Sequence, residues 1–482
     1  MKLYNTMSRQ LDELQPLEAG VVKLYTCGLT VYSQPHIGNW IGYIYWDILV
    51  RTLLADGYTV VRTQNITDVG HLVSDDDSGE DKMEKGARAE GLTAWDVAAK
   101  YSAIAEHEGY EMLGLLRPTH LVAATSCIDE QIEFAKVLDD HGYLYRTDDG
   151  MYFDTSKLAD YGKLARLDIH GLQAGARVDM AGKRQPTDFA VWKFSPVGNQ
   201  RDMEWDSPWG KGFPGWHLEC SVIARETLGD QIDIHTGGID HIPVHHTNEI
   251  AQTESVTGQP FASIWLHNNH LKVDGHKMSK SLGNIYTLSD IESRGYDMSD
   301  FRMFALGKHY RTEGNFTWEN LAAAHNRLQR WRDMASLRWQ TNDTLQDDDD
   351  NDDVYDVNGA ILAAPHAALE ALNNDLDTPG ALIAIEQAFD HIDLAPLSQL
   401  QQHALQQLVA WCDEVLGLGL AQATPDITDN QKRYILERRR ARDDKNWQRS
   451  DEIRDELAAQ SITLRDTLTQ TIWSRESLIV DH

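Results

Sequence analysis

The stretch HKMSKSLGN at 276–284 has the residue types of a phosphate-handling loop. It places two lysines, Lys277 and Lys280, among serines in a short polar segment. Cations held against developing charge are the main means by which proteins accelerate phosphoryl and adenylyl transfer. Exposed Lys/Ser loops are usually only solvated, so the stretch needs a second element to support the interpretation.

That second element is HIGN at 36–39, which directly follows turn-forming residues and precedes an apolar run. We expect His36 and Asn39 to donate hydrogen bonds to phosphate at a helix N-terminus, where free N–H groups attract anions. Gly38 carries no side chain and would let a nucleotide approach the backbone. The two motifs together predict an enzyme that activates a carboxylate with ATP and Mg²⁺.

A third, weaker nucleotide signal is GGID at 237–240. Gly237 permits close backbone approach after a predicted strand, and the carboxylate of Asp240 could hold ribose hydroxyls. A turn with a surface aspartate is the simpler alternative.

Four residues have the chemistry of a metal site: Cys27, Cys220, His245 and Glu249. His245 and Glu249 stand at positions i and i+4, which share one face of a helix. Two thiolates, an imidazole and a carboxylate suit Zn²⁺. Buried cysteines are often plain core residues, however, and spacing alone leaves both interpretations open.

The order of predicted strands and helices around these residues indicates an α/β fold. VVKLY at 21–25 predicts a buried strand, 40–54 a helix and 58–65 a second strand. A second half resumes with the strand-like GWHLEC at 215–220 and a strand at 232–235. We therefore expect a Rossmann-like doubly wound parallel sheet, with ligands at the carboxyl ends of its strands.

The composition argues against three classes of protein: general nucleic-acid binders, membrane-spanning or secreted proteins, and disulfide-rich proteins. The chain has 482 residues, 41% of them hydrophobic, and a net charge of −31, which argues against general attraction to nucleic acid. It has no apolar run long enough to span a membrane and no signal-peptide segment at its start, so we expect a cytoplasmic protein. Four cysteines are too few for a disulfide framework, and Cys127 and Cys412 read as buried thiols.

Composition shifts, including the acidic run at 347–353, suggest the domain boundaries. The last region is locally basic: residues 430–449 hold eight Lys or Arg and three Asp or Glu, as expected for an RNA contact. The expected catalytic part has a first Rossmann half at 1–126, an inserted connective module at 127–205 and a second Rossmann half at 206–270. It is followed by the lysine loop and a region expected to contact an RNA stem at 271–325, a helical bundle at 326–420 and a small C-terminal domain at 425–482.

Several ordered motifs resemble those of the class I aminoacyl-tRNA synthetases, and more narrowly of the cysteinyl-tRNA synthetases. The resemblance covers nearly the whole chain. It is carried by TCGLTVY at 26–32, HIGN at 36–39, NITD at 65–68, GWHLEC at 215–220, DIHTGGID at 233–240, HHTNEIAQ at 245–252, KVDGHKMSKSLGN at 272–284 and LDTPGAL at 376–382.

The resemblance implies that L-cysteine is activated by ATP and transferred to the 3′ end of tRNA(Cys). It implies one zinc ion per chain, held by Cys27, Cys220, His245 and Glu249, that binds the substrate thiolate. Residues matching the family's cysteine pocket are Thr67, Trp216, His217 and His235. The C-terminal domain would read the anticodon, with Asp466 and Trp473 as candidate base contacts. The family also implies a monomer.

The chain departs from the family pattern in three places: Asn39 replaces the usual second histidine, Leu29 replaces a proline, and TDVGHLVSDDDSGEDKMEKGA at 67–87 differs from the more frequent TDIDDK. Two other functions share parts of this signature. A ligase that joins cysteine to a glucosaminyl-inositol amine lacks the tRNA-reading extension, so residues 425–482 disfavour it. A non-catalytic RNA-binding paralogue is disfavoured by the intact Lys277, Lys280 and His36.

Overall fold

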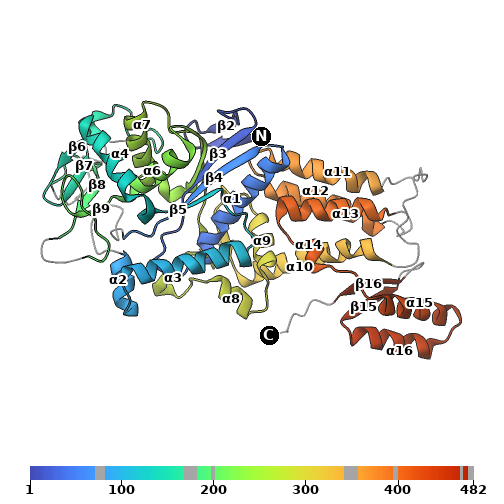
Figure 1. Ribbon diagram of the computed structural model, residues 1–482. Helices are drawn as coiled ribbons and strands as arrows, with labels where there is room; N and C mark the ends of the chain where they lie inside the picture. Colours follow the sequence, from blue (N-terminus) through green and yellow to red (C-terminus); the bar gives the residue numbers. More distant parts are fainter. Residues whose placement is uncertain are drawn as a thin grey trace. The chain divides into compact units, whose positions relative to one another are not determined.

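A five-stranded parallel sheet forms the centre of the first part of the chain, with strand order β11-β10-β3-β4-β5. Apolar and β-branched side chains fill its inner strands, and Val22, Leu24, Ile232 and Ile234 are all fully buried. This arrangement confirms the predicted Rossmann-like α/β class (Figure 1). The strands are β3 (Val21–Thr26), β4 (Thr59–Ile66), β5 (His120–Ala123), β10 (Ile232–Gly238) and β11 (Ala262–Asn268).

The computed structural model describes residues 1–70, 82–167, 182–196, 201–340, 357–394, 400–466 and 471–475. It contains two compact units. The first consists of Met1–Lys272, Met278–Thr287 and Tyr310–Gly314, and the second of Val273–Lys277, Leu288–His309 and Asn315–His482. Among the described residues, no helix has the length and apolar character needed to cross a membrane.

Three helices of the first unit matter for the site: α1 (Ile37–Ala55), α6 (Trp216–Leu228) and α7 (His245–Thr257). The prediction of a strand at 215–220 is wrong, because this segment begins α6, with Gly215 as its N-cap. Residues 217–224 are all buried, and a continuously buried run does not distinguish a strand from a helix. α6 packs on β3 and β4 and beside α7.

An antiparallel sheet of order β6-β7-β8-β9 lies within the same unit. It is seen in green beside α4 and α6 in Figure 1. Its strands and the remaining elements of this unit are β1 (Lys2–Asn5), β2 (Gln10–Glu13), α2 (Lys82–Glu90), α3 (Ala94–Glu106), α4 (Ile128–Asp140), β6 (Leu144–Arg146), β7 (Gly150–Phe153), β8 (Phe189–Phe194) and β9 (Gly212–Pro214).

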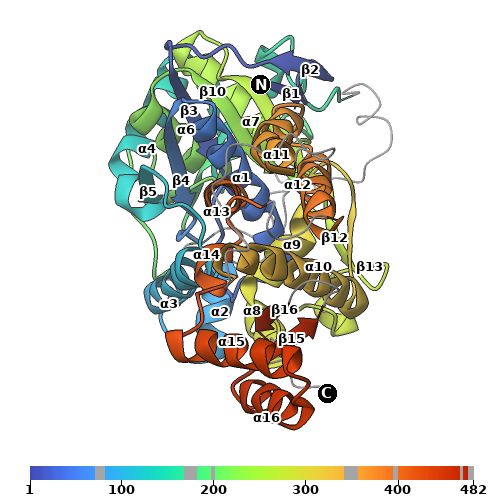
Figure 2. The ribbon, with the colours of Figure 1, turned by 90° about the vertical axis from the view of Figure 1, so that its right-hand side faces the viewer.

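The second unit is mainly helical. Its C-terminal part pairs two helices with a hairpin around a core that includes Ile435, Ile453 and Trp473 (Figure 2). Its helices are α8 (Leu288–Ser293), α9 (Met298–Leu306), α10 (Trp318–Ser336), α11 (Val357–Leu372), α12 (Thr378–Leu394), α13 (Gln402–Trp411), α14 (Leu420–Ala423), α15 (Asp429–Asp443) and α16 (Trp447–Ala458), and its hairpin strands are β15 (Ile462–Asp466) and β16 (Thr471–Arg475). The short strands β12 (Leu271–Val273), β13 (His276–Lys277) and β14 (Gly314–Phe316) form a further small sheet.

Candidate metal centre and nucleotide site

The four candidate metal ligands come together from three elements. Cys27 directly follows β3, Cys220 lies on α6, and His245 and Glu249 lie one turn apart on α7. Their side chains are buried, and one donor atom of each lies within 4.8 Å of all the others. The Nε2 atom of His245 is 2.7 Å from Oε1 of Glu249. Two sulfurs, a nitrogen and an oxygen at this spacing match the donors that zinc takes.

Cys27 is held at the carboxyl edge of the sheet by its backbone. Its N–H donates to the carbonyl of Thr236 on β10, at 3.3 Å. The next residue, Gly28, donates its N–H to Oδ1 of Asn65 at 2.7 Å. A Cβ at Gly28 would stand 1.6 Å from the carbonyl oxygen of Asn65, so no other residue fits without moving the strand end.

Charges in this buried group are mutually compensated. Burial would raise the pKa of Glu249, but His235 and His245 hold it well below its usual range. Burial would lower the pKa of His245, but Glu249 and Cys220 raise it to about 10. Burial and the hydrogen bond to Cys220 raise the pKa of Cys27. The protein thus stabilises negative charge on the carboxylate of Glu249 and disfavours it on the sulfur of Cys27.

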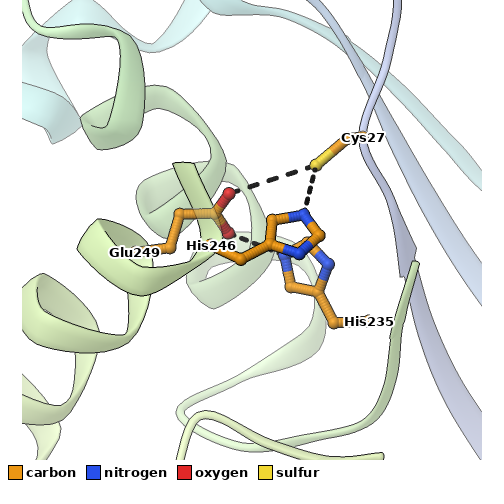
Figure 3. A group of neighbouring side chains, drawn as sticks. All are labelled: Cys27, His235, His246 and Glu249. Carbon is orange, nitrogen blue, oxygen red and sulfur yellow. Dashed lines mark hydrogen bonds and ion pairs between the residues drawn. The ribbon is translucent and has the colours of Figure 1, made fainter. Parts of the chain in front are cut away.

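A second group of donors overlaps the first and is drawn in Figure 3. It consists of Cys27, His235, His246 and Glu249, again buried and within 4.8 Å of one another. Sequence reasoning missed His246. Successive residues on a helix point about 100° apart, so a pattern based on one helix face selects His245 and excludes its neighbour.

The four predicted cysteine-pocket residues lie around these donors. The ring of Trp216 lies 4.4 Å from that of His245, centroid to centroid. Nδ1 of His217 is 3.1 Å from Nδ1 of His245, and Nε2 of His235 is 2.6 Å from Oε2 of Glu249. Thr67 is linked less directly, through the side chain of Asn65. Trp216, His217 and His235 thus lie beside the donor group at the edge of the sheet, with Thr67 further away.

The HIGN motif forms the N-terminus of α1. His36 is the N-cap, and its Nδ1 accepts a hydrogen bond from the Asn39 N–H at 3.3 Å. In return, Oδ1 of Asn39 accepts from the His36 N–H at 3.0 Å, which completes a capping box. Burial lowers the pKa of His36, so its imidazole is neutral at pH 7. The N–H groups of Ile37 and Asn39 donate to Tyr286 and His36, so the Gly38 N–H is the group of this helix end that is suited to phosphate.

Gly38 joins this helix end to the lysine loop. A Cβ at Gly38 would meet the Met278 methyl carbon at 2.0 Å, and the Ile37 N–H donates to the Tyr286 carbonyl at 2.9 Å. Lys277 is exposed at the end of β13. Lys280 begins a short 3₁₀ turn, and its side chain lies outside the described residues.

The glycine of GGID has a packing role that the sequence did not reveal. A Cβ at Gly237 would stand 2.7 Å from Cε1 of His246 and 2.8 Å from Nδ1 of His241. The glycine is therefore required by the histidine cluster, whatever it offers a nucleotide. Asp240 is exposed in the following 3₁₀ turn, where its carboxylate is accessible.

The two candidate tRNA contacts are both engaged within the C-terminal fold. Trp473 is 1% exposed and belongs to the core there, so its ring has no open face for a base. This placement argues against the predicted stacking role. Asp466 is paired with Arg438, at 2.7 Å, and with Arg442. Trp447, which was not among the predicted contacts, is 58% exposed at the start of α16, after the arginine-rich α15.

Comparison with known proteins gives two family matches. Residues 13–326 match the class I (C) catalytic domain of tRNA synthetases, and residues 424–473 match the anticodon binding domain of cysteinyl-tRNA ligases. Curated relatives include cysteine–tRNA ligase 1 of Burkholderia lata, 46% identical over 97% of this chain and 95% of the relative. The cysteine–tRNA ligase of Treponema denticola is 38% identical over 98% of this chain and 99% of the relative.

Solved structures share the fold at low identity. The methionyl-tRNA synthetase of Mycobacterium tuberculosis bound to methionyl-adenylate has a TM-score of 0.57 and 16% identity, and the match covers 84% of this chain and 91% of that one. The leucyl-tRNA synthetase of Agrobacterium radiobacter has a TM-score of 0.60 and 12% identity, covering 87% of this chain and 88% of that one.

Proposed function

The chain belongs to the cysteine–tRNA ligases, a family of class I synthetases, and from this premise we propose how its own residues carry out the family's reaction. The enzyme joins L-cysteine to tRNA(Cys) and converts ATP to AMP and diphosphate. The carboxylate of cysteine first attacks the α-phosphate of ATP, giving cysteinyl-adenylate. A ribose hydroxyl at the 3′ end of the tRNA then attacks the activated carbonyl.

The observation that carries our proposal is the buried donor group at the carboxyl edge of the sheet. We assign one zinc ion per chain to Cys27, Cys220, His245 and Glu249. The donor chemistry supports this, because zinc accepts thiolate, imidazole and carboxylate together. Bound there, zinc would supply a soft cationic partner for the thiolate of the substrate.

Selection of cysteine over serine needs such a partner. A pocket that relies on size and shape separates two substrates of similar size by only about 1–3 kcal/mol. We propose that Trp216 and His217 line the pocket beside His245, with Thr67 further along its edge and His235 behind Glu249. These residues would orient the side chain of the substrate and exclude water from it.

On the ATP side, we propose that His36, Gly38 and Asn39 present the start of α1 to the phosphates. Lys277 and Lys280 would balance charge on the α-phosphate and on the departing diphosphate, together with Mg²⁺. Gly237 and Asp240 would lie at the ribose. Because the reaction needs no protein nucleophile, these groups act by alignment and charge stabilisation.

On the tRNA side, we propose that α15 and α16 supply the anticodon contact. Exposed Trp447 follows the arginines of α15 and offers a surface on which a base can stack. In this proposal Asp466 positions Arg438 and Arg442 instead of pairing with a base. The match of residues 424–473 to an anticodon binding domain supports a tRNA acceptor over an amine acceptor.

We also propose the six-part domain division given above, a monomeric state and a cytoplasmic location.

One experiment tests the core of this proposal. Zinc content and cysteine-dependent ATP–pyrophosphate exchange are measured on the same preparation, with serine as the control substrate. We expect one tightly bound zinc and exchange with cysteine only. Replacing Lys280 with Ala should abolish most of the exchange while zinc content is unchanged. Exchange that persists in zinc-free protein, or equal exchange with serine, would contradict the assignment.

A further inference from the structure

The carboxylate of Glu249 faces two different histidines with its two oxygens. Oε1 is 2.7 Å from Nε2 of His245, and Oε2 is 2.6 Å from Nε2 of His235. The first contact lies within the zinc group assigned above, and the second lies outside it. A carboxylate oriented in this way has the geometry of a bridging ligand, which serves one ion with each oxygen.

Cys27 is shared in the same manner. Its Sγ belongs to the group with Cys220 and His245, yet it also lies 3.3 Å from Nε2 of His246. Figure 3 shows the sulfur above the rings of His235 and His246, with Glu249 completing the group. Four donors of three kinds therefore form a second group, which shares Cys27 and Glu249 with the first and adds His235 and His246.

The two additional histidines are fixed in orientation. Nδ1 of His246 is 2.8 Å from Nε2 of His267, whose Nδ1 is 2.7 Å from Oγ1 of Thr6. Metal-binding histidines typically have such an outer partner on the second ring nitrogen, which sets the tautomer and the ring angle. The ring of His235 stacks on Trp265, with centroids 4.6 Å apart and planes 16° apart.

We propose that Cys27, His235, His246 and Glu249 form a second binding position for a divalent cation of the zinc class, bridged to the first by Cys27 and Glu249. The inference goes beyond the proposed function and rests on it only for the first ion. The second ion meets the charge of the first, so it binds more weakly and fills its position only at excess metal. Binding is a coordination step in which the imidazole nitrogens and the shared anionic ligands donate electron pairs. The proton that Nε2 of His235 shares with Glu249 leaves that nitrogen when the ion binds, and no oxidant or reductant takes part.

Occupation of the second position has a functional consequence. His235 would then bind metal instead of serving the cysteine pocket, so excess zinc would inhibit cysteine-dependent exchange. The second position thus makes the enzyme responsive to the free zinc concentration.

The test is a cobalt titration of the full-length protein after removal of bound metal with a chelator. Thiolate-to-cobalt absorption and calorimetry report the number and order of bound ions. For the wild type we expect two ions, the first tight and the second weaker. His246→Asn should bind the first ion only. His267→Ala leaves all donors in place and should weaken the second ion by about 10–100-fold, the usual effect of losing an outer partner.

His241→Ala is the matched control, because His241 lies in the same cluster but in neither donor group. It should still bind two ions, and excess zinc should inhibit it as it does the wild type. A wild-type protein that binds one ion at saturation, or a folded His246→Asn protein that binds two, would overturn the inference. Loss of the first ion in Cys220→Ser tests the zinc assignment separately, so failure of the two proposals can be distinguished.

Discussion

Replacing Gly38 with Ala should slow cysteine activation without destabilising the protein. The new methyl group would stand 2.0 Å from the Met278 methyl carbon, whereas carbon atoms in contact prefer about 3.5–4.0 Å. Met278 must therefore retreat by about 1.5–2 Å. The Met278 side chain is flexible, and the His36 ring, 3.1 Å from the new methyl group, has to give by only a few tenths of an ångström. Ala is also favoured over Gly in a helix, by less than the roughly 1 kcal/mol of a helix interior at this second helical position, so the free energy of unfolding should hardly fall.

The catalytic effect should be much larger than the effect on stability. Met278 directly precedes Ser279 and Lys280, so displacing it shifts the start of the lysine loop. A misplacement of about 1 Å in a catalytic group can reduce the rate by about 10²-fold. The assay is cysteine-dependent ATP–pyrophosphate exchange at saturating ATP, accompanied by thermal unfolding. We expect a loss of roughly this size in kcat, with an unfolding midpoint at or slightly above that of the wild type.

A second substitution decides between two reasons for the glycine. If Gly38 is needed to make room for Met278, then Met278→Ala should restore most of the activity lost in Gly38→Ala. If it is needed so that a nucleotide can approach the backbone, the double variant should be as slow as Gly38→Ala. Met278→Ala alone is the control for loss of the thioether. A double variant without recovery would refute the packing argument.

Three further predictions concern the metal, the tRNA surface and pH. Replacing Cys220 with Ser should reduce zinc affinity by more than the roughly 10–100-fold that outer partners contribute, measured by competition with a chelator; undiminished affinity would exclude it as a ligand. Trp447→Ala should weaken tRNA binding by about 1–3 kcal/mol at fixed salt and leave exchange intact. Trp473→Ala should instead destabilise the C-terminal fold by about 3–5 kcal/mol, and the opposite pattern in these two variants would reverse our assignment. The hydrogen bonds from Arg438 lower the pKa of Asp466 to about 2. Its stabilising effect should therefore be complete above about pH 4 and lost as pH falls toward about 2. The loss should be about 1 kcal/mol or less, because the Asp466 side chain is partly exposed although Arg438 is buried, and hydrogen exchange in β15 should show no such loss in Asp466→Asn.

The positions of three of the four candidate metal ligands follow from local geometry. His245 and Glu249 stand one helical turn apart, and Cys27 follows a strand whose carboxyl end points to the ligand side of the sheet. Cys220 also lies in this group, although its segment was expected to be a strand. Its side chain reaches the group from a helix, which no pattern in residues 215–220 indicates.

The features that the sequence did not predict depend on tertiary packing. His246 joins the cluster because Gly237, on a neighbouring strand, leaves room for its ring. Trp447 and Trp473 are chemically alike, and only the packing of Trp473 against Ile435 and Ile453 separates a core residue from an exposed one. The residue type therefore indicates which interactions a tryptophan can make, whereas its burial decides whether it can make them with another molecule.

The geometry of the donor group is built into the backbone at the edge of the sheet. Gly28 lies just after β3, and Gly237 lies near the end of the adjacent strand β10. A Cβ at Gly28 would stand 1.6 Å from the Asn65 carbonyl oxygen, and a Cβ at Gly237 would stand 2.7 Å from the His246 ring. The first collision is with main chain, which cannot move aside as a flexible side chain can. Because Cys27 directly precedes Gly28, its sulfur is placed by the strand ends themselves and not by a mobile loop. In the zinc assignment proposed above, this fixed placement would hold the ion in one position relative to the side chain of the substrate.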